Sequence, residues 1–124
     1  MSLVDSSVLI DILRRRQPAL TLLEQRRTQD ILESSVVVKV EVLSGMRANE
    51  EPRTRALIDS IAWHPVDDLI AEEAGRLGRR WLPSHGGIDA VDLIVAATAN
   101  VLALDLLTTN VKRFPMFPDL AAPY

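Results

Sequence analysis

The chain has 124 residues, of which 48% are hydrophobic and 25% are charged, and it has no cysteine. These values fit one soluble globular domain over residues 1–124, and the lack of cysteine excludes disulfides, zinc–thiolate sites and thiol catalysis. There are 14 Lys and Arg against 17 Asp and Glu, so the basic excess of proteins that bind duplexes by counter-ion release is missing. No signal peptide is visible and no uncharged stretch approaches the ~20 residues that span a bilayer, so we expect a cytoplasmic protein.

The first half of the chain predicts two buried strands, each followed by helices. Residues 2–5 predict a very short strand, because the apolar run stops at three residues of types that begin helices. Apolar residues then recur at helical spacing, and Pro18 suits the first turn of a second helix over residues 18–27. Residues 31–38 are rich in β-branched side chains and predict the second strand. Two more helices are predicted over residues 40–48 and 52–61.

The second half predicts a similar alternation. A short strand is predicted over residues 63–66, followed by a helix over residues 67–82 and a Gly-containing loop at residues 83–87. Residues 88–102 form the most apolar predicted helix, which we expect to be buried. The last strand is predicted over residues 103–108 and precedes a proline-containing tail.

Short buried strands that alternate with helices indicate an α/β fold with a mostly parallel sheet. In such sheets, ligands bind beyond the carboxyl ends of the strands, where the strand order reverses. Polar side chains that follow strands are therefore candidate site residues. Asp5 follows the first predicted strand, Glu41 follows the second and Asn110 follows the last. Asp92 lies at the start of the helix that precedes the last strand.

Two of these acids also have ordinary structural explanations. Asp5 could cap the helix that follows it, although Ser6 and Ser7 can also cap and would leave Asp5 free for other roles. Glu41 either shares an exposed stripe with Lys39 or is buried beside a cation, because burying an unpaired carboxylate is costly.

Asp89 and Asp92 share the start of the apolar helix. Asp89 is the better N-cap, and Asp92 could simply complement the helix dipole. Because residues 93–104 are uncharged, we expect the helix to pack on most sides and to leave Asp92 facing a cleft. Asp92 is therefore the better candidate for chemistry.

Three carboxylates from separate segments repel one another if they converge on one pocket. A hard divalent cation relieves that repulsion, since Mg²⁺ is held by a few carboxylates and keeps several waters for a substrate phosphate. Such a site activates water and stabilises charge that develops on a phosphodiester. Asp5, Glu41 and Asp92 are therefore predicted to hold Mg²⁺, for which Mn²⁺ could substitute.

Four stretches of the chain match a known family in order and spacing, namely residues 3–11, 40–45, 92–99 and 107–114. Through these stretches the chain resembles the PIN domain family, and within it the small toxin ribonucleases of VapBC-type toxin–antitoxin modules. The resemblance covers essentially the whole chain. It implies a three-layer α/β/α sandwich with a central parallel sheet of four or five strands.

The resemblance also implies an activity, that of a Mg²⁺-dependent endoribonuclease that acts as the toxin of a type II module. Mg²⁺ on Asp5 and Asp92 would activate water for attack on an RNA phosphodiester, and Glu41 would hold a metal-bound water or act as base. Cleavage would leave a 5′-phosphate and a 3′-hydroxyl. The implied partners are RNA, a second copy of the chain in a homodimer, and a cognate antitoxin whose C-terminal segment lies across the cleft.

Three polar residues complete the site that the resemblance implies. Asn110 stands where many relatives carry a fourth acid, and its amide could orient water or a metal ligand. Ser6 and Thr108 match small hydroxyl positions near the family's site and are expected to support the acids. The amide at Asn110 also leaves an alternative open, in which a non-catalytic PIN-like module binds RNA or protein and cleaves nothing.

A basic face is predicted on the helix over residues 67–82. Arg79 and Arg80 follow Arg76 by three and four positions, so all three share one helix face and could contact RNA phosphates. We prefer the alternative that these arginines form a solvated face and pair with Glu72 and Glu73, because such pairs are common on helices.

Overall fold

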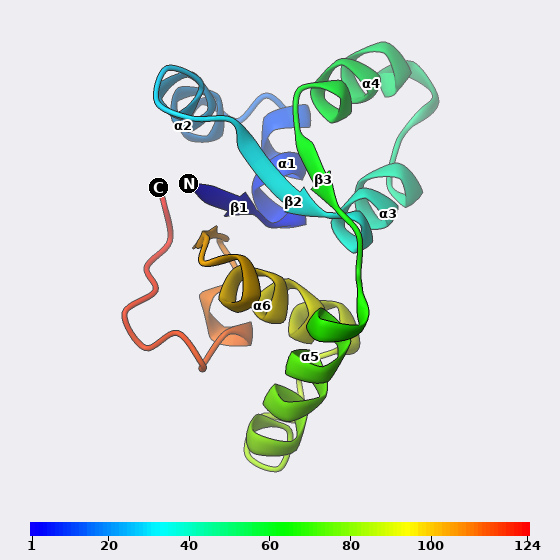
Figure 1. Cartoon of the computed structure of the whole chain (residues 1–124). Coiled ribbons are helices and arrows are strands. Elements are labelled where there is room, and N and C mark those ends of the chain that lie inside the picture. Colours follow the sequence, from blue (N-terminus) through cyan, green and yellow to red (C-terminus); the bar gives the residue numbers. More distant parts are fainter.

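Four short strands lie at the centre of the computed structural model, which describes residues 1–124 (Figure 1). Their order across the sheet is β3-β2-β1-β4, and every neighbouring pair is parallel. The first strand of the chain therefore occupies the middle of the sheet, as the predicted α/β fold requires. The strands are β1 (Ser2–Val4), β2 (Leu32–Ser35), β3 (Ala62–His64) and β4 (Asp105–Leu107).

Helices cover both faces of this sheet, which confirms the three-layer α/β/α arrangement. Helices α1 and α2 lie on one side of the sheet and α5 and α6 on the other (Figure 1), while α3 contacts both α1 and α6. None of the helices has the length and hydrophobicity needed to cross a membrane. The helices are α1 (Ser6–Leu13), α2 (Gln17–Arg27), α3 (Val36–Ser44), α4 (Glu51–Asp59), α5 (Asp68–Trp81) and α6 (Ala90–Leu102), with short 3-10 helices η1 (Ala48–Glu50) and η2 (Val111–Arg113).

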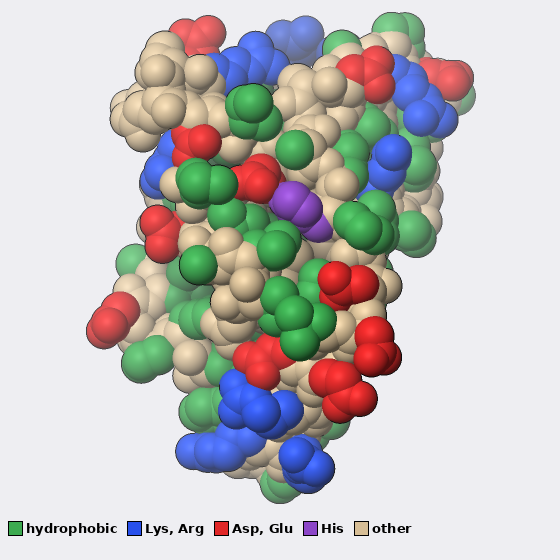
Figure 2. All heavy atoms as spheres, viewed as in Figure 1, with side chains coloured by type: hydrophobic (Ala, Val, Ile, Leu, Met, Phe, Trp, Pro, Cys, Tyr) green, Lys and Arg blue, Asp and Glu red, His purple; other side chains and the backbone are tan.

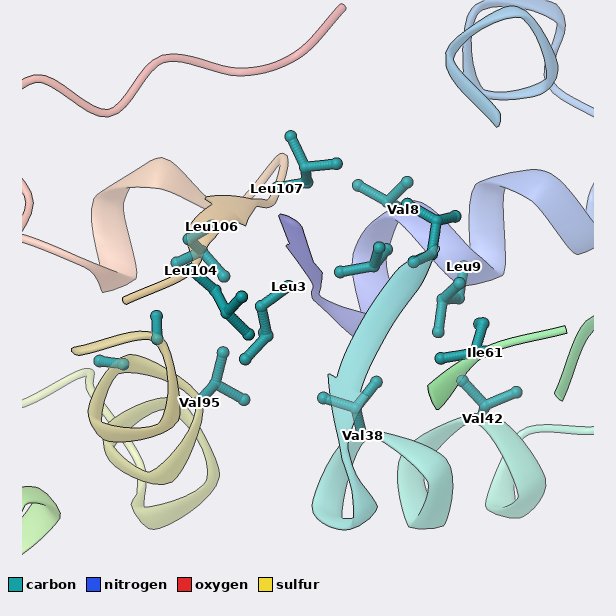
Figure 3. Packing of buried hydrophobic residues seen from close by; sticks show 14 of the residues in the cluster. Leu3, Val8, Leu9, Val38, Val42, Ile61, Val95, Leu104, Leu106 and Leu107 are labelled. Atoms are coloured by element: carbon teal, nitrogen blue, oxygen red, sulfur yellow. The ribbon is translucent and has the colours of Figure 1, made fainter. Parts of the chain in front are cut away.

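Apolar side chains from the sheet and the helices form the core (Figure 3). Leu3 of the central strand is fully buried, and Val95 of α6 points toward it in Figure 3. Val38 and Val42 are one helical turn apart and present a buried face of α3 to the same core. This packing fixes the positions of β1, which Asp5 follows, and of α3 and α6, which carry Glu41 and Asp92.

The junction between β2 and α3 differs from the prediction, which placed a strand over residues 31–38 and a helix over residues 40–48. The strand ends at Ser35 and the helix begins at Val36. Ser35 caps this helix, because its Oγ accepts a hydrogen bond from the backbone N–H of Val37 at 3.3 Å. Three consecutive valines favour a strand locally, but the buried helical face of α3 overrides that preference. Glu41 therefore lies well inside α3 rather than near its start.

One of the ion pairs that we preferred on α5 is present, between Arg76 and Glu73. Arg76 donates two hydrogen bonds to Glu73, at 2.6 and 2.9 Å, and Asn100 of α6 donates a third at 2.9 Å. The Arg80 guanidinium lies 4.3 Å from the ring centre of Trp81. Figure 2 shows acidic and basic side chains side by side over this helix. The pairing of Arg76 is thus confirmed. Two of the three arginines on this face, Arg76 and Arg80, already contact side chains of the protein.

Candidate active site

The candidate site lies where the strand order reverses, between β1 and β4. From β1 the chain proceeds to β2 on one side, and the last strand pairs with β1 on the other side. Asp5 directly follows β1 and Thr108 directly follows β4. The backbone N–H of Asp5 donates to the carbonyl of Leu107 at 2.9 Å, which holds these two strand ends together.

Asp5 is buried, with 4% of its surface exposed, and both of its carboxylate oxygens accept hydrogen bonds. Oδ1 accepts from the backbone N–H of Ser6 at 2.8 Å, and Oδ2 accepts from the Thr108 hydroxyl at 2.7 Å. Asp5 is the N-cap of α1, so of the two alternatives left open by the sequence the capping role belongs to Asp5 and not to Ser6 or Ser7. The helix already begins at Ser6, because Asp5 itself has the extended backbone of a cap residue. Burial raises the pKa of Asp5, and the hydrogen bonds from Thr108 and Ser6 oppose that rise.

Thr108 connects Asp5 to two further groups. Its Oγ1 accepts from the backbone N–H of Asn110 at 3.0 Å and lies 3.3 Å from the Ser7 hydroxyl. Because the single hydroxyl proton of Thr108 is directed at Asp5, Ser7 is the donor in this last contact. Ser7 in turn accepts from the backbone N–H of Thr109 at 3.1 Å. The orientation of Asp5 is therefore fixed by a network that joins the start of α1 to the end of β4.

Glu41 reaches the same region from α3 and is half-buried. Burial is the largest cause that raises the pKa of Glu41, and the carboxylates of Asp5, Asp89 and Asp92 raise it further. The Ser6 side chain acts in the opposite direction and lowers this pKa. The charges of Asp5, Asp89 and Asp92 therefore all act on Glu41. Glu41 is half-buried rather than fully exposed, and it forms no ion pair with Lys39, whose amino group lies 5.6 Å from the ring centre of Trp63.

Asp89 and Asp92 form a reciprocal capping box at the start of α6. Asp89 is the N-cap and accepts from the Asp92 N–H at 2.9 Å, while Asp92 accepts from the Asp89 N–H at 3.1 Å. The two side chains differ sharply in exposure, at 57% for Asp89 and 11% for Asp92. Burial raises the pKa of Asp92, as do the charge of Asp89 and its side chain. Asp92 thus both completes the cap and faces inward.

Arg113 of η2 lies beside this capping box. Its Nη1 is 3.3 Å from Oδ2 of Asp92 and 3.5 Å from Oδ2 of Asp89. The sequence gives one signal for this contact, since Arg113 lies close after Asn110 in the stretch that follows the last strand. Neither Arg113 nor Ser7 is among the predicted site residues. The Asn110 side chain is exposed, and only its backbone N–H joins the network around Thr108.

The acidic group fits a hard divalent cation by its chemistry. Its ligands would be carboxylate oxygens, which Mg²⁺ prefers, and Asp5, Asp89 and Asp92 all disfavour a further negative charge on Glu41. In the present side-chain positions, no three His, Asp or Glu side chains are close enough together to hold a metal ion. Coordination by Asp5, Glu41 and Asp92 would therefore require these carboxylates to move closer together.

The chain is thus an α/β protein with a parallel sheet and an acidic site at the point where the strand order reverses. The family model for the PIN domain matches residues 2–119. The chain is 44% identical to Ribonuclease VapC19 of Mycobacterium tuberculosis, and the match covers 100% of both chains. It is 41% identical to Ribonuclease VapC10 of the same organism, over 100% of this chain and 93% of that protein.

A solved structure has the same fold. The structure of a toxin-antitoxin complex from Klebsiella pneumoniae superposes with a TM-score of 0.84 at 26% identity, covering 100% of this chain and 98% of that one. This chain belongs to the PIN domain family, as the resemblance of its four stretches indicated.

Proposed function

We propose that this protein is a Mg²⁺-dependent endoribonuclease that acts as the toxin of a type II toxin–antitoxin module. One observation supports the proposal above all: the carboxylates of Asp5 and Asp92, which come from distant segments, both raise the pKa of Glu41. The pKa of each of these acids is raised, above all by burial, so each one favours neutralisation in the folded protein. The names of its relatives VapC19 and VapC10, both ribonucleases, support RNA as the substrate.

The chain's own residues would orient the reacting groups. Bound Mg²⁺ would supply a more acidic water and stabilise negative charge on the phosphate. Asp5 and Asp92 would hold the metal, and Thr108 fixes the orientation of Asp5 beforehand. Glu41, from α3, would accept a proton from water or hold a water in place. The Asn110 amide would orient a water at the exposed edge of the site.

The proposed partners are a cognate antitoxin and a second copy of the chain. The similarity to a toxin-antitoxin complex supports the antitoxin, because the matched chain covers the whole of this protein. An antitoxin segment that crosses the acidic group would shield it from RNA. We also propose that the protein acts in the cytoplasm, where its RNA substrates are made.

The test is cleavage of total RNA by the purified protein, with Mg²⁺ or with a chelator. We expect cleavage only with Mg²⁺, and losses of at least about 100-fold in Asp5→Asn and Asp92→Asn. Asp59→Asn is the matched control, since Asp59 is exposed at the end of α4, before β3 and away from the carboxyl ends of the strands. It should cleave like the wild type.

Thermal melting of the same samples separates loss of activity from loss of fold. Mg²⁺ should raise the melting temperature of the wild type and of Asp59→Asn, and Asp5→Asn should lose most of that increase. Equal cleavage by the wild type and both site variants would contradict the proposal. A wild type that binds RNA but never cleaves it would instead support the non-catalytic module.

A further inference from the structure

Arg113 is the cation that pairs with the acidic group. Its guanidinium reaches Asp92 and Asp89 through the same nitrogen, at 3.3 and 3.5 Å. Its backbone is held in place from both sides: its N–H donates to the carbonyl of Asn110 at 3.0 Å, and the adjacent Phe114 is 1% exposed. The guanidinium is therefore attached to a fixed part of the chain while its tip, half exposed, extends over the capping box.

The charge of Arg113 acts on the acids that are proposed to hold the metal. With Nη1 within 3.5 Å of both carboxylates of the capping box, the positive charge of Arg113 offsets part of their mutual repulsion. Arg113 thus stabilises the ionised carboxylates when no metal is bound. A divalent cation would take over the same task, because it also neutralises these charges.

A bound divalent cation and Arg113 would share the single carboxylate of Asp92. Asp92 directs Oδ2 at both Arg113 and the Asp89 N–H. Movement of Asp92 toward Asp5 and Glu41, which metal binding requires, would lengthen or break the contact with Arg113. Two positive charges that share one carboxylate also repel each other.

We propose that Arg113 is a built-in competitor of the divalent cation, which stabilises the metal-free protein and lowers the metal affinity of the site. The inference rests on the proposed metal-binding function. Because the pair is half exposed, the effect is moderate: removal of Arg113 should tighten Mg²⁺ binding by about 3- to 10-fold.

The experiment is a calorimetric Mg²⁺ titration of the full chain without RNA, for the wild type, Arg113→Gln and Lys112→Gln. Lys112 is the matched control, since it is exposed, lies in the same 3-10 helix and forms no ion pair with the acids. Arg113→Gln should bind Mg²⁺ more tightly than both other proteins. In a chelator, Arg113→Gln should have a lower melting temperature than the wild type. Saturating Mg²⁺ should remove or reverse this difference in melting temperature.

Two results would overturn the inference alone. One is wild-type Mg²⁺ affinity in Arg113→Gln, and the other is an equal gain in Lys112→Gln, which would indicate only a general effect of net charge. If Arg113→Gln fails to fold, Arg113→Lys replaces it; a compact ammonium competes less well with the metal, so affinity should rise about 2-fold, and no rise overturns the inference. Absence of Mg²⁺ binding in every protein, the wild type included, would overturn the proposed function as well.

Discussion

The hydroxyl group of Thr108 determines how Asp5 is presented. This one side chain donates to the Asp5 carboxylate, accepts from the Asn110 backbone and receives a contact from Ser7. It is fully buried, so water cannot replace these bonds when the hydroxyl is removed. The hydrogen bonds of this single threonine therefore link the carboxyl end of β1 to that of β4.

Thr108→Val should lower the free energy of unfolding by about 1–3 kcal/mol, because a buried carboxylate loses its donor and a backbone N–H loses its acceptor. Thr108→Ser should retain most of the stability. Thr98→Val is a matched control, since Thr98 is equally buried but donates only to the carbonyl of Ile94 in its own helix, at 2.7 Å. Urea denaturation in a chelator measures all three, and equal losses in both valine variants would contradict this role of Thr108.

At the scale of elements, α3 shows why the sequence and the structure disagree over residues 36–38. Local β-propensity predicts a strand there, whereas the helix is selected by its cap at Ser35 and by the burial of Val38 and Val42. The early helix start has a functional effect. It places Glu41 on the second turn of a packed helix, from which its carboxylate reaches the neighbourhood of Asp5 and Asp92.

Ser35→Ala should cost about 1 kcal/mol, since the N–H of Val37 loses its cap in a buried position. Ser44→Ala, at the exposed end of the same helix, should change the free energy of unfolding by less than about 0.5 kcal/mol. Urea denaturation measures both. The opposite order of losses would show that the cap does not determine where α3 begins.

At the scale of the whole molecule, Glu41 should make the free energy of unfolding increase as the pH falls, which is the opposite of the usual effect of a carboxylate. The folded protein raises the pKa of Glu41, so it binds the proton more tightly than the unfolded chain does. The contribution of Glu41 to stability therefore increases as the pH falls through the raised pKa, and it levels off below the ordinary value of a glutamate.

In a chelator at neutral pH, Glu41→Gln should be more stable than the wild type by less than about 1 kcal/mol, because water screens a half-exposed group. This advantage should shrink as the pH falls and vanish once the wild-type glutamate is protonated. Saturating Mg²⁺ at neutral pH should reverse the order, since the wild type binds the ion more tightly. Urea denaturation over a pH series measures the difference, and an advantage that grows on acidification would contradict the raised pKa.

The architecture could be predicted from the sequence, and the three acids could be proposed as site residues, because local signals mark them. Short apolar segments mark the strands, and Asp5 follows the first of them at the edge where parallel strands end, whereas Glu41 and Asp92 lie on helices. Ser7 and Arg113 could not be found in this way. Their roles depend on contacts with Thr108 and Asp92, which are 101 and 21 positions away along the chain. The position of Arg113 soon after Asn110 marks it as a candidate, but the sequence does not show which acids it contacts.

The bond between Thr108 and Asp5 joins positions that are 103 residues apart, so almost the whole chain must be present before it forms. A contact between positions this far apart closes a very long loop, and the entropic cost of closing it is offset only when β1 and β4 pair. Asp5 should therefore gain its fixed orientation late in folding, after the two ends of the chain have met.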